Sequence, residues 1–148
     1  MRPLIKAGLL ATMLLTASAW AQNTSPVGLW KTIDDESGKP KALVRITEEN
    51  GALQGKIEKL FRGPNEDQNP TCGECKDSRK GQPLIGMTIV SGLKKDGNEY
   101  TGGEILDPAK GKVYKSKATL RDGGQKLEVR GYIGAPMFGR SQVWQREQ

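Results

Sequence analysis

The chain has 148 residues, a formal net charge of +6 and no histidine. The absence of histidine excludes Ser-His-Asp and Cys-His catalysis, and it excludes zinc or haem sites with histidine ligands. Lysine and arginine are mixed with aspartate and glutamate, without a block of like charge. This pattern favours a solvated surface over a face that binds nucleic acid or membrane.

Residues 1–21 have the organisation of a secretory signal peptide. Arg2 and Lys6 precede an uncharged, leucine-rich segment, which ends at the small-x-small pattern Ala19-Trp20-Ala21 that signal peptidase requires. The apolar segment is too short to span a bilayer, which argues against a permanent anchor. We expect cleavage before Gln22. The mature chain then keeps 127 of the 148 residues, and its charge falls from +6 to +4 with the loss of the two cations.

The mature segment alternates strand-like runs with turn residues and contains no convincing amphipathic helix. The runs are Val27–Ile33, Ala42–Glu48, Leu53–Phe61, Gly86–Leu93, Glu99–Leu106, Lys112–Arg121, Lys126–Ile133 and Gly139–Arg146. Asn50-Gly51 is a strong hairpin signal, because both residues tolerate positive φ. In the run that follows, Leu53, Ile57 and Phe61 are predicted to face one side.

Two later runs alternate more regularly. In Lys112–Arg121, one face carries Tyr114, Ser116, Ala118 and Leu120, and the other face is basic. In Lys126–Ile133, one face is predicted to carry Leu127, Val129, Gly131 and Ile133. Such alternation is typical of strands with one buried face.

The fold class predicted from these runs is all-β. Eight antiparallel strands with mostly short connections commonly close into an up-and-down barrel, and a two-sheet sandwich is the alternative. We expect one domain over residues 22–148. It is interrupted by a long loop at Arg62–Pro83, which holds three prolines and both cysteines. Loops of this length in compact domains are often functional.

The first and last runs carry a tryptophan and two arginines. Gly28-Leu29-Trp30 is the Gly-x-Trp pattern of lipocalin-like barrels, in which the indole packs across one end beneath an arginine of the final strand. A guanidinium stacks well on an indole face. We predict that Trp30 and Arg140 form this structural plug, and Arg146 is the other arginine on that strand.

Cys72-Gly73-Glu74-Cys75 is the most conspicuous chemical motif. In an exported protein two cysteines usually pair, so we predict a Cys72–Cys75 disulfide that clips the loop. A thioredoxin-like redox centre is the alternative, although the residues that follow have no apolar helical face. A zinc site would need further ligands, which neither another cysteine nor a histidine supplies.

Several segments together resemble a bacterial exported family known as domain of unknown function 2147. They are Gly28-Leu29-Trp30-Lys31-Thr32, Asn50-Gly51 with Gly55-Lys56-Ile57, Cys72 and Cys75, Pro83-Leu84-Ile85-Gly86-Met87, Gly103-Glu104-Ile105-Leu106-Asp107-Pro108, Gly111-Lys112 with Tyr114, Arg130-Gly131-Tyr132-Ile133-Gly134, and Gly139-Arg140 with Trp144. The resemblance covers nearly all of the mature chain. It implies a periplasmic single-domain protein with a lipocalin-like barrel, and it assigns no chemistry.

From these features we expect a periplasmic, non-enzymatic module that binds a small apolar or amphipathic ligand. Small residues beside polar ones on barrel strands can leave room for a ligand, although glycines also relieve strain where strands bend. The candidate contacts are Glu104, Tyr114, Arg130 and Tyr132. We predict no catalytic residue, metal, cofactor, nucleic-acid partner or membrane span.

Two other functions are compatible with the sequence. One is an interaction or envelope-stress protein that acts through its outer surface, which predicts a filled barrel and an exposed apolar patch. The other is an enzyme, either a thiol oxidoreductase that uses Cys72 and Cys75 or a carboxylate-based hydrolase.

Overall fold

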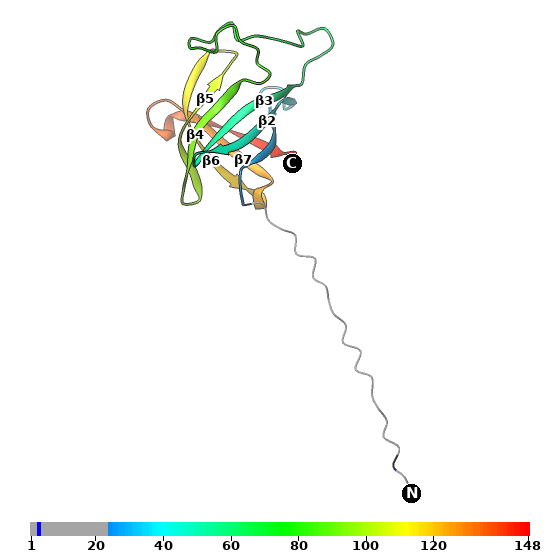
Figure 1. The fold of residues 1–148 in the computed structure, drawn as a ribbon, viewed down its shortest axis with the longest axis vertical. Helices are drawn as coiled ribbons and strands as arrows, with labels where there is room; N and C mark the ends of the chain where they lie inside the picture. The colour runs from blue at the N-terminus through cyan, green and yellow to red at the C-terminus, as the bar shows by residue number, and fades with distance from the viewer. Residues whose placement is uncertain (1–2, 4–23) are drawn as a thin grey trace.

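The structure is a computed structural model that describes residue 3 and residues 24–148 (Figure 1). The predicted cleavage site, and the predicted signal peptide apart from residue 3, lie outside the described residues. The elements are β1 (Gly28–Ile33), β2 (Pro40–Glu49), β3 (Ala52–Leu60), β4 (Thr88–Asp96), β5 (Glu99–Asp107), β6 (Lys112–Arg121), η1 (Asp122–Gly124), β7 (Lys126–Tyr132), η2 (Pro136–Phe138) and β8 (Gly139–Arg146). In this part of the chain, no helix has the length and apolar character needed to cross a membrane.

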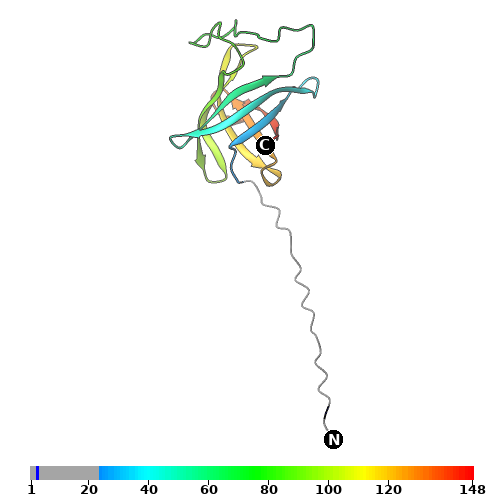
Figure 2. The same cartoon turned by 45° about the vertical axis from the view of Figure 1, so that its right-hand side comes forward.

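The eight strands form one closed barrel, which confirms the predicted fold class (Figures 1 and 2). Each strand pairs antiparallel with the next, and β8 returns to pair with β1. That last seam is short, because it contains only the pairs Trp30↔Arg146 and Lys31↔Gln145. The predicted strand boundaries differ from the observed ones by at most three residues.

The core lies inside the barrel and follows the period of two that strands impose. On β6, Ser116 and Ala118 are buried whereas Lys115 is exposed, which confirms the alternation predicted for this run. The largest buried side chains are Trp30 and Trp144, with exposed fractions of 0% and 1%.

A β-bulge changes the phase of β3. Val44 pairs with Ile57, but the preceding residue of β2 pairs with Lys59, so Glu58 is an extra residue on β3. Beyond the bulge Leu60 takes the inward phase, and Phe61 is 38% exposed. The prediction that Phe61 faces the core is therefore wrong.

The prediction for Ile133 is also wrong. β7 ends at Tyr132, and Ile133 is 63% exposed in the connection to β8. Period-two alternation gives no inward direction once the strand has ended, so the apolar pattern alone could not place this side chain.

The two ends of the barrel differ in their connections. The tight-turn end carries the short turns at 50–51, 97–98 and 122–125. The loop end carries the connections 34–39, 61–87, 108–111 and 133–138. The connection between β3 and β4 is by far the longest of these, and it arches over the loop end in green in Figure 1.

Candidate functional site

Trp30 and Arg146 close the tight-turn end. The indole of Trp30 is fully buried and its Nε1 donates to the Pro26 carbonyl oxygen at 2.8 Å. The guanidinium carbon of Arg146 lies 4.3 Å from the centre of the indole ring. Partial burial away from water holds the pKa of Arg146 below its usual value. This pair forms a plug, as expected for a Gly-x-Trp barrel strand.

The arginine in the plug is Arg146 and not Arg140, so the assignment of Arg140 is corrected. Arg146 donates from Nε to the Gly124 carbonyl at 2.7 Å and from Nη2 to the Ser25 carbonyl at 2.6 Å. Arg140 lies at the other end of β8, where its exposed guanidinium forms an ion pair with Asp35. The two arginines are six residues apart on one strand and therefore reach opposite ends of the barrel.

A row of small residues crosses the inner face of three strands. Ser116 on β6 pairs with Gly103 on β5 and with Gly131 on β7. Residues directly opposite each other in an antiparallel sheet project to the same face, and Ser116 is completely buried, so this face is the interior. β6 runs from the loop end to the tight-turn end, and Ser116 is its next inward residue after Tyr114. The row therefore lies deeper in the barrel than Tyr114.

The hydroxyl of Ser116 has no hydrogen-bond partner among the described residues. Its surroundings are apolar. The Leu93 side chain occupies the space beside Gly103, where an added Cβ would come within 2.7 Å of it. Beside Gly131 an added Cβ would meet Ile105 at 3.4 Å, which is ordinary contact. A buried hydroxyl without a partner is unfavourable by about 1–3 kcal/mol, so this position is a candidate contact for a bound molecule.

The structure does not bring the four predicted ligand contacts together. Only Tyr114 faces the interior, because it pairs with Ile105 in the inward phase. Glu104 and Tyr132 lie on the outer face, each opposite Lys115. Arg130 donates to the carbonyl oxygens of Pro136 at 2.6 Å and Gly139 at 3.2 Å, so it holds the connection between β7 and β8.

Sequence reasoning missed Ser116 as a candidate contact. The serine was recognisable as part of an inward face, between Tyr114 and Ala118, but a single serine in an alternating strand is common. The informative signal is that both of its cross-strand neighbours are glycines. That signal needs the register, which the sequence alone does not provide.

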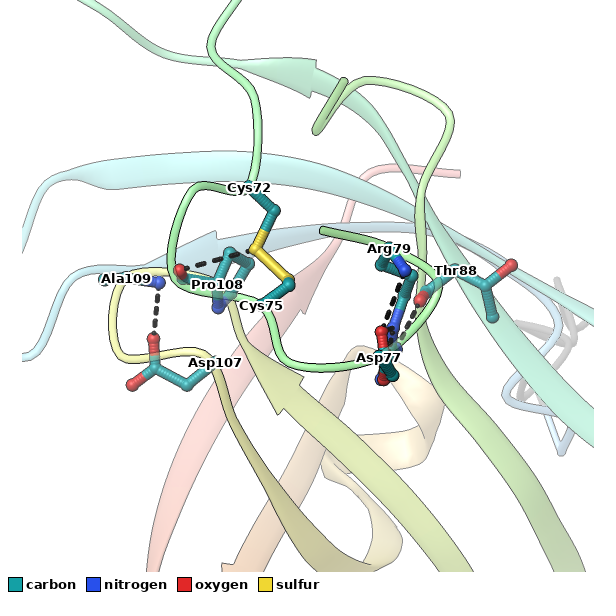
Figure 3. Close-up of a disulfide and its surroundings, with 8 residues drawn as sticks. All are labelled: Cys72, Cys75, Asp77, Arg79, Thr88, Asp107, Pro108 and Ala109. Atoms are coloured by element: carbon teal, nitrogen blue, oxygen red, sulfur yellow. Dashed lines mark hydrogen bonds and ion pairs between the residues drawn. A yellow bond between two sulfur atoms is a disulfide. The ribbon is translucent and has the colours of Figure 1, made fainter. Parts of the chain in front are cut away.

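At the loop end, Cys72 and Cys75 form the predicted disulfide (Figure 3). Both cysteines are 1% exposed. The Cys72 amide donates to the Gln82 carbonyl at 2.9 Å, and the Gly81 amide donates to the Cys72 carbonyl at 2.7 Å. The disulfide therefore belongs to a folded part of the long loop, which is itself closed by a bridge between Thr71 and Pro83.

The disulfide packs against the turn between β5 and β6. The Cys72 sulfur lies 3.7 Å from the Pro108 carbonyl oxygen (Figure 3). A disulfide sulfur carries no hydrogen, so this is a packing contact. Gly111 in the same turn has a φ of +66°, and a Cβ there would fall 1.8 Å from the Glu74 carbonyl oxygen. A glycine is required where the loop and the turn approach this closely.

The same loop covers part of the outer barrel wall. Leu106 and Ile89 point out of the barrel, because each lies next to an inward residue along its strand. They are nevertheless only 3% and 8% exposed. Beside them, Arg79 donates to the Thr88 carbonyl at 2.9 Å and to the Asp77 carboxylate, and hydrogen bonds from the Arg79 side chain and backbone lower the pKa of Asp77 to about 2. A groove of about 370 Å³ remains between the loop and this wall.

This setting fits a structural disulfide. Thiol–disulfide exchange needs an accessible sulfur, and catalytic Cys-x-x-Cys motifs use a helix N-terminus to stabilise the thiolate. Both cysteines are buried, and no helix follows Cys75 directly.

Replacing both cysteines with serine is expected to lower the free energy of unfolding by about 2 kcal/mol, because the cross-link no longer restrains the unfolded chain. The barrel should stay folded, with unchanged far-ultraviolet circular dichroism, while limited proteolysis cuts within residues 62–83. Two outcomes would contradict a structural role confined to the loop: loss of the circular dichroism of the barrel, or a loop that resists protease as well as the wild-type loop does.

The comparisons with known proteins agree with this architecture. A solved structure, protein HP1028 from the human pathogen Helicobacter pylori, described as belonging to the lipocalin family, superposes with a TM-score of 0.72. The two chains are 18% identical, and the match covers 84% of each, so the likeness shows the fold. No curated protein matches this chain. The family model described as an uncharacterised protein conserved in bacteria, DUF2147, matches residues 28–146, and the chain therefore belongs to the DUF2147 family.

Proposed function

We propose that this protein is an exported, periplasmic, non-enzymatic module that holds a small apolar or amphipathic ligand inside its barrel. The observation that carries the proposal is the Ser116 hydroxyl, which is buried without a partner among the described residues. A polar group of the ligand would bond this hydroxyl, and apolar neighbours such as Leu93 and Ile105 would contact the rest of it. The lipocalin-like barrel supports this proposal, and the signal peptide predicted at residues 1–21 supports the proposed location.

We infer that a ligand would approach Ser116 from the loop end. Tyr114 is the next inward side chain of β6 in that direction, and it is half-buried. The tight-turn end is blocked, because the Trp30–Arg146 plug fills it. A ligand therefore enters past Tyr114, with its polar group leading toward Ser116.

The direct test is native mass spectrometry of protein purified from the periplasm, followed by solvent extraction and identification of the extract. We expect a bound species whose mass is lost on extraction. Protein that is consistently empty, and that also fails to bind apolar fluorescent probes in titration, would overturn the proposal.

Replacing Ser116 with alanine is expected to stabilise the empty protein and to weaken ligand binding. The free energy of unfolding of the empty protein should rise by about 1 kcal/mol, because an unsatisfied buried hydroxyl is removed. The affinity for the extracted ligand should fall roughly tenfold, because one hydrogen bond is lost. Chemical denaturation and calorimetric titration measure the two quantities.

Ser91→Ala is the matched control. Ser91 pairs with Glu104 on the outer wall of the barrel. Its replacement should change stability by less than about 0.5 kcal/mol and leave ligand affinity unchanged. Equal behaviour of the two variants would argue against a ligand at Ser116.

A further inference from the structure

The most exposed large apolar side chains of the described residues gather in one connection. Ile133, Met137 and Phe138 are 63%, 77% and 71% exposed. All three lie in Ile133–Phe138, between β7 and β8, which we call the apolar tip. The tip contains no charged residue and projects from the barrel wall, in orange in Figure 1. Exposed apolar clusters of this kind mark interaction sites.

Hydrogen bonds to backbone carbonyl groups hold the conformation of the apolar tip. The Phe138 amide donates to the Ala135 carbonyl at 3.0 Å, which closes the turn of η2. The Arg130 guanidinium donates to the carbonyls of Pro136 and Gly139, and to Ser141 Oγ at 3.0 Å. These bonds satisfy carbonyl groups that would otherwise need water, which lowers the free-energy penalty of moving the tip into an apolar medium.

Two positively charged side chains, Arg130 and Lys115, lie at the base of the tip. Arg130 bonds only neutral oxygen atoms. Among the described residues neither Arg130 nor Lys115 forms an ion pair within 4.0 Å, and Glu104 on β5 lies directly opposite Lys115. Lys115 is directly opposite Tyr132, the residue before the tip. This order of groups fits a bilayer surface. The apolar side chains of the tip would meet the acyl chains, and the tyrosine and basic groups at its base would meet the headgroups.

We propose that the apolar tip docks the barrel onto a bilayer that contains anionic phospholipid. Ile133, Met137 and Phe138 enter the boundary between headgroups and acyl chains, and Arg130 and Lys115 remain among the headgroup phosphates. The tip is a projection and not a groove, so a deformable apolar layer fits it better than the side chain of a peptide would. This inference does not depend on the ligand proposed for the interior.

The test is flotation with vesicles made of equal parts phosphatidylglycerol and phosphatidylcholine. Every variant is expressed as the full chain, so the N-terminal residues are the same in all samples. The triple variant I133S/M137S/F138S should bind on the order of a hundredfold more weakly than wild type, because three apolar side chains are lost from the bilayer. Lys115→Gln should weaken binding about fivefold, and pure phosphatidylcholine vesicles should remove this difference.

Ile85→Ser is the matched control, because Ile85 is 43% exposed but lies just before β4, a strand that neighbours neither β7 nor β8. It should float as wild type does. Thermal melting checks that each variant is folded. Equal flotation of wild type and the triple variant overturns the proposal.

Phe138→Trp reports on insertion directly. Trp30 and Trp144 are buried, and wild type, which has the same Trp20, is the reference. A vesicle-dependent blue shift and quenching by brominated lipid beyond those of wild type therefore come from position 138. We expect both signals. Absence of both signals would overturn membrane docking. A dimer in sedimentation experiments that is lost in the triple variant would also overturn it, and would identify a second copy of the chain as the partner.

Discussion

Replacing Arg146 with alanine is expected to lower the free energy of unfolding by about 3 kcal/mol, the largest effect of any single side-chain truncation proposed for the barrel. The guanidinium covers the Trp30 indole and donates to backbone carbonyls of Ser25, Val27 and Gly124. Its loss exposes the indole and leaves these carbonyls without their donor. The N-terminal lead and the turn at η1 should both loosen.

Arg146→Lys tests whether geometry or charge matters in this plug. Lysine keeps the charge but has no planar group to stack on Trp30, and it cannot reach several carbonyls at once, so we expect it to recover only part of the stability. Arg140→Ala is the control and should change stability by less than about 1 kcal/mol, because its ion pair is exposed. Urea denaturation measures all three. Equal losses for Arg140→Ala and Arg146→Ala would contradict the assignment of the plug.

Gly111→Ala is expected to lower the free energy of unfolding by about 3 kcal/mol and to release the disulfide loop from the barrel. Two causes add. Alanine is strained at a φ of +66°, and its Cβ would lie 1.8 Å from the Glu74 carbonyl oxygen. The segment around Cys75 must then move away, which exposes the buried cysteines and the covered Leu106.

Gly97→Ala separates the two causes. Gly97 also has a positive φ, +60°, but no atom lies within 4 Å of its added Cβ. We expect a loss of about 1 kcal/mol there, from backbone strain alone. Proteolysis of the 62–83 loop should accelerate for Gly111→Ala and stay unchanged for Gly97→Ala. If the two variants behave alike, the close approach of the loop is not what holds it.

The fold was predictable because strand signals are local. Asn50-Gly51 marked a hairpin, and the alternation along Lys112–Arg121 identified its buried face correctly. The Cys72–Cys75 pairing was predictable as well, because these are the two cysteines of the chain.

The candidate site was much less predictable. Glu104, Tyr114, Arg130 and Tyr132 were chosen for their chemistry, and all but Tyr114 lie on the outer wall of the barrel. Inward and outward positions alternate residue by residue, so one chemical motif spreads over both faces. The Ser116 position became visible only when the register placed Gly103 and Gly131 beside it.

The sequence by itself determined the all-β class, the order of the strands and the covalent clip, because each follows from neighbours along the chain. It favoured a barrel over a two-sheet sandwich, and the seam between β1 and β8 decided between them. Only the tertiary structure decided which arginine covers Trp30, where the bulge turns Phe61 outward, and why Gly111 must be a glycine. These depend on contacts between residues far apart in sequence. Their energies come from packing and hydrogen bonding in three dimensions, which no local pattern records.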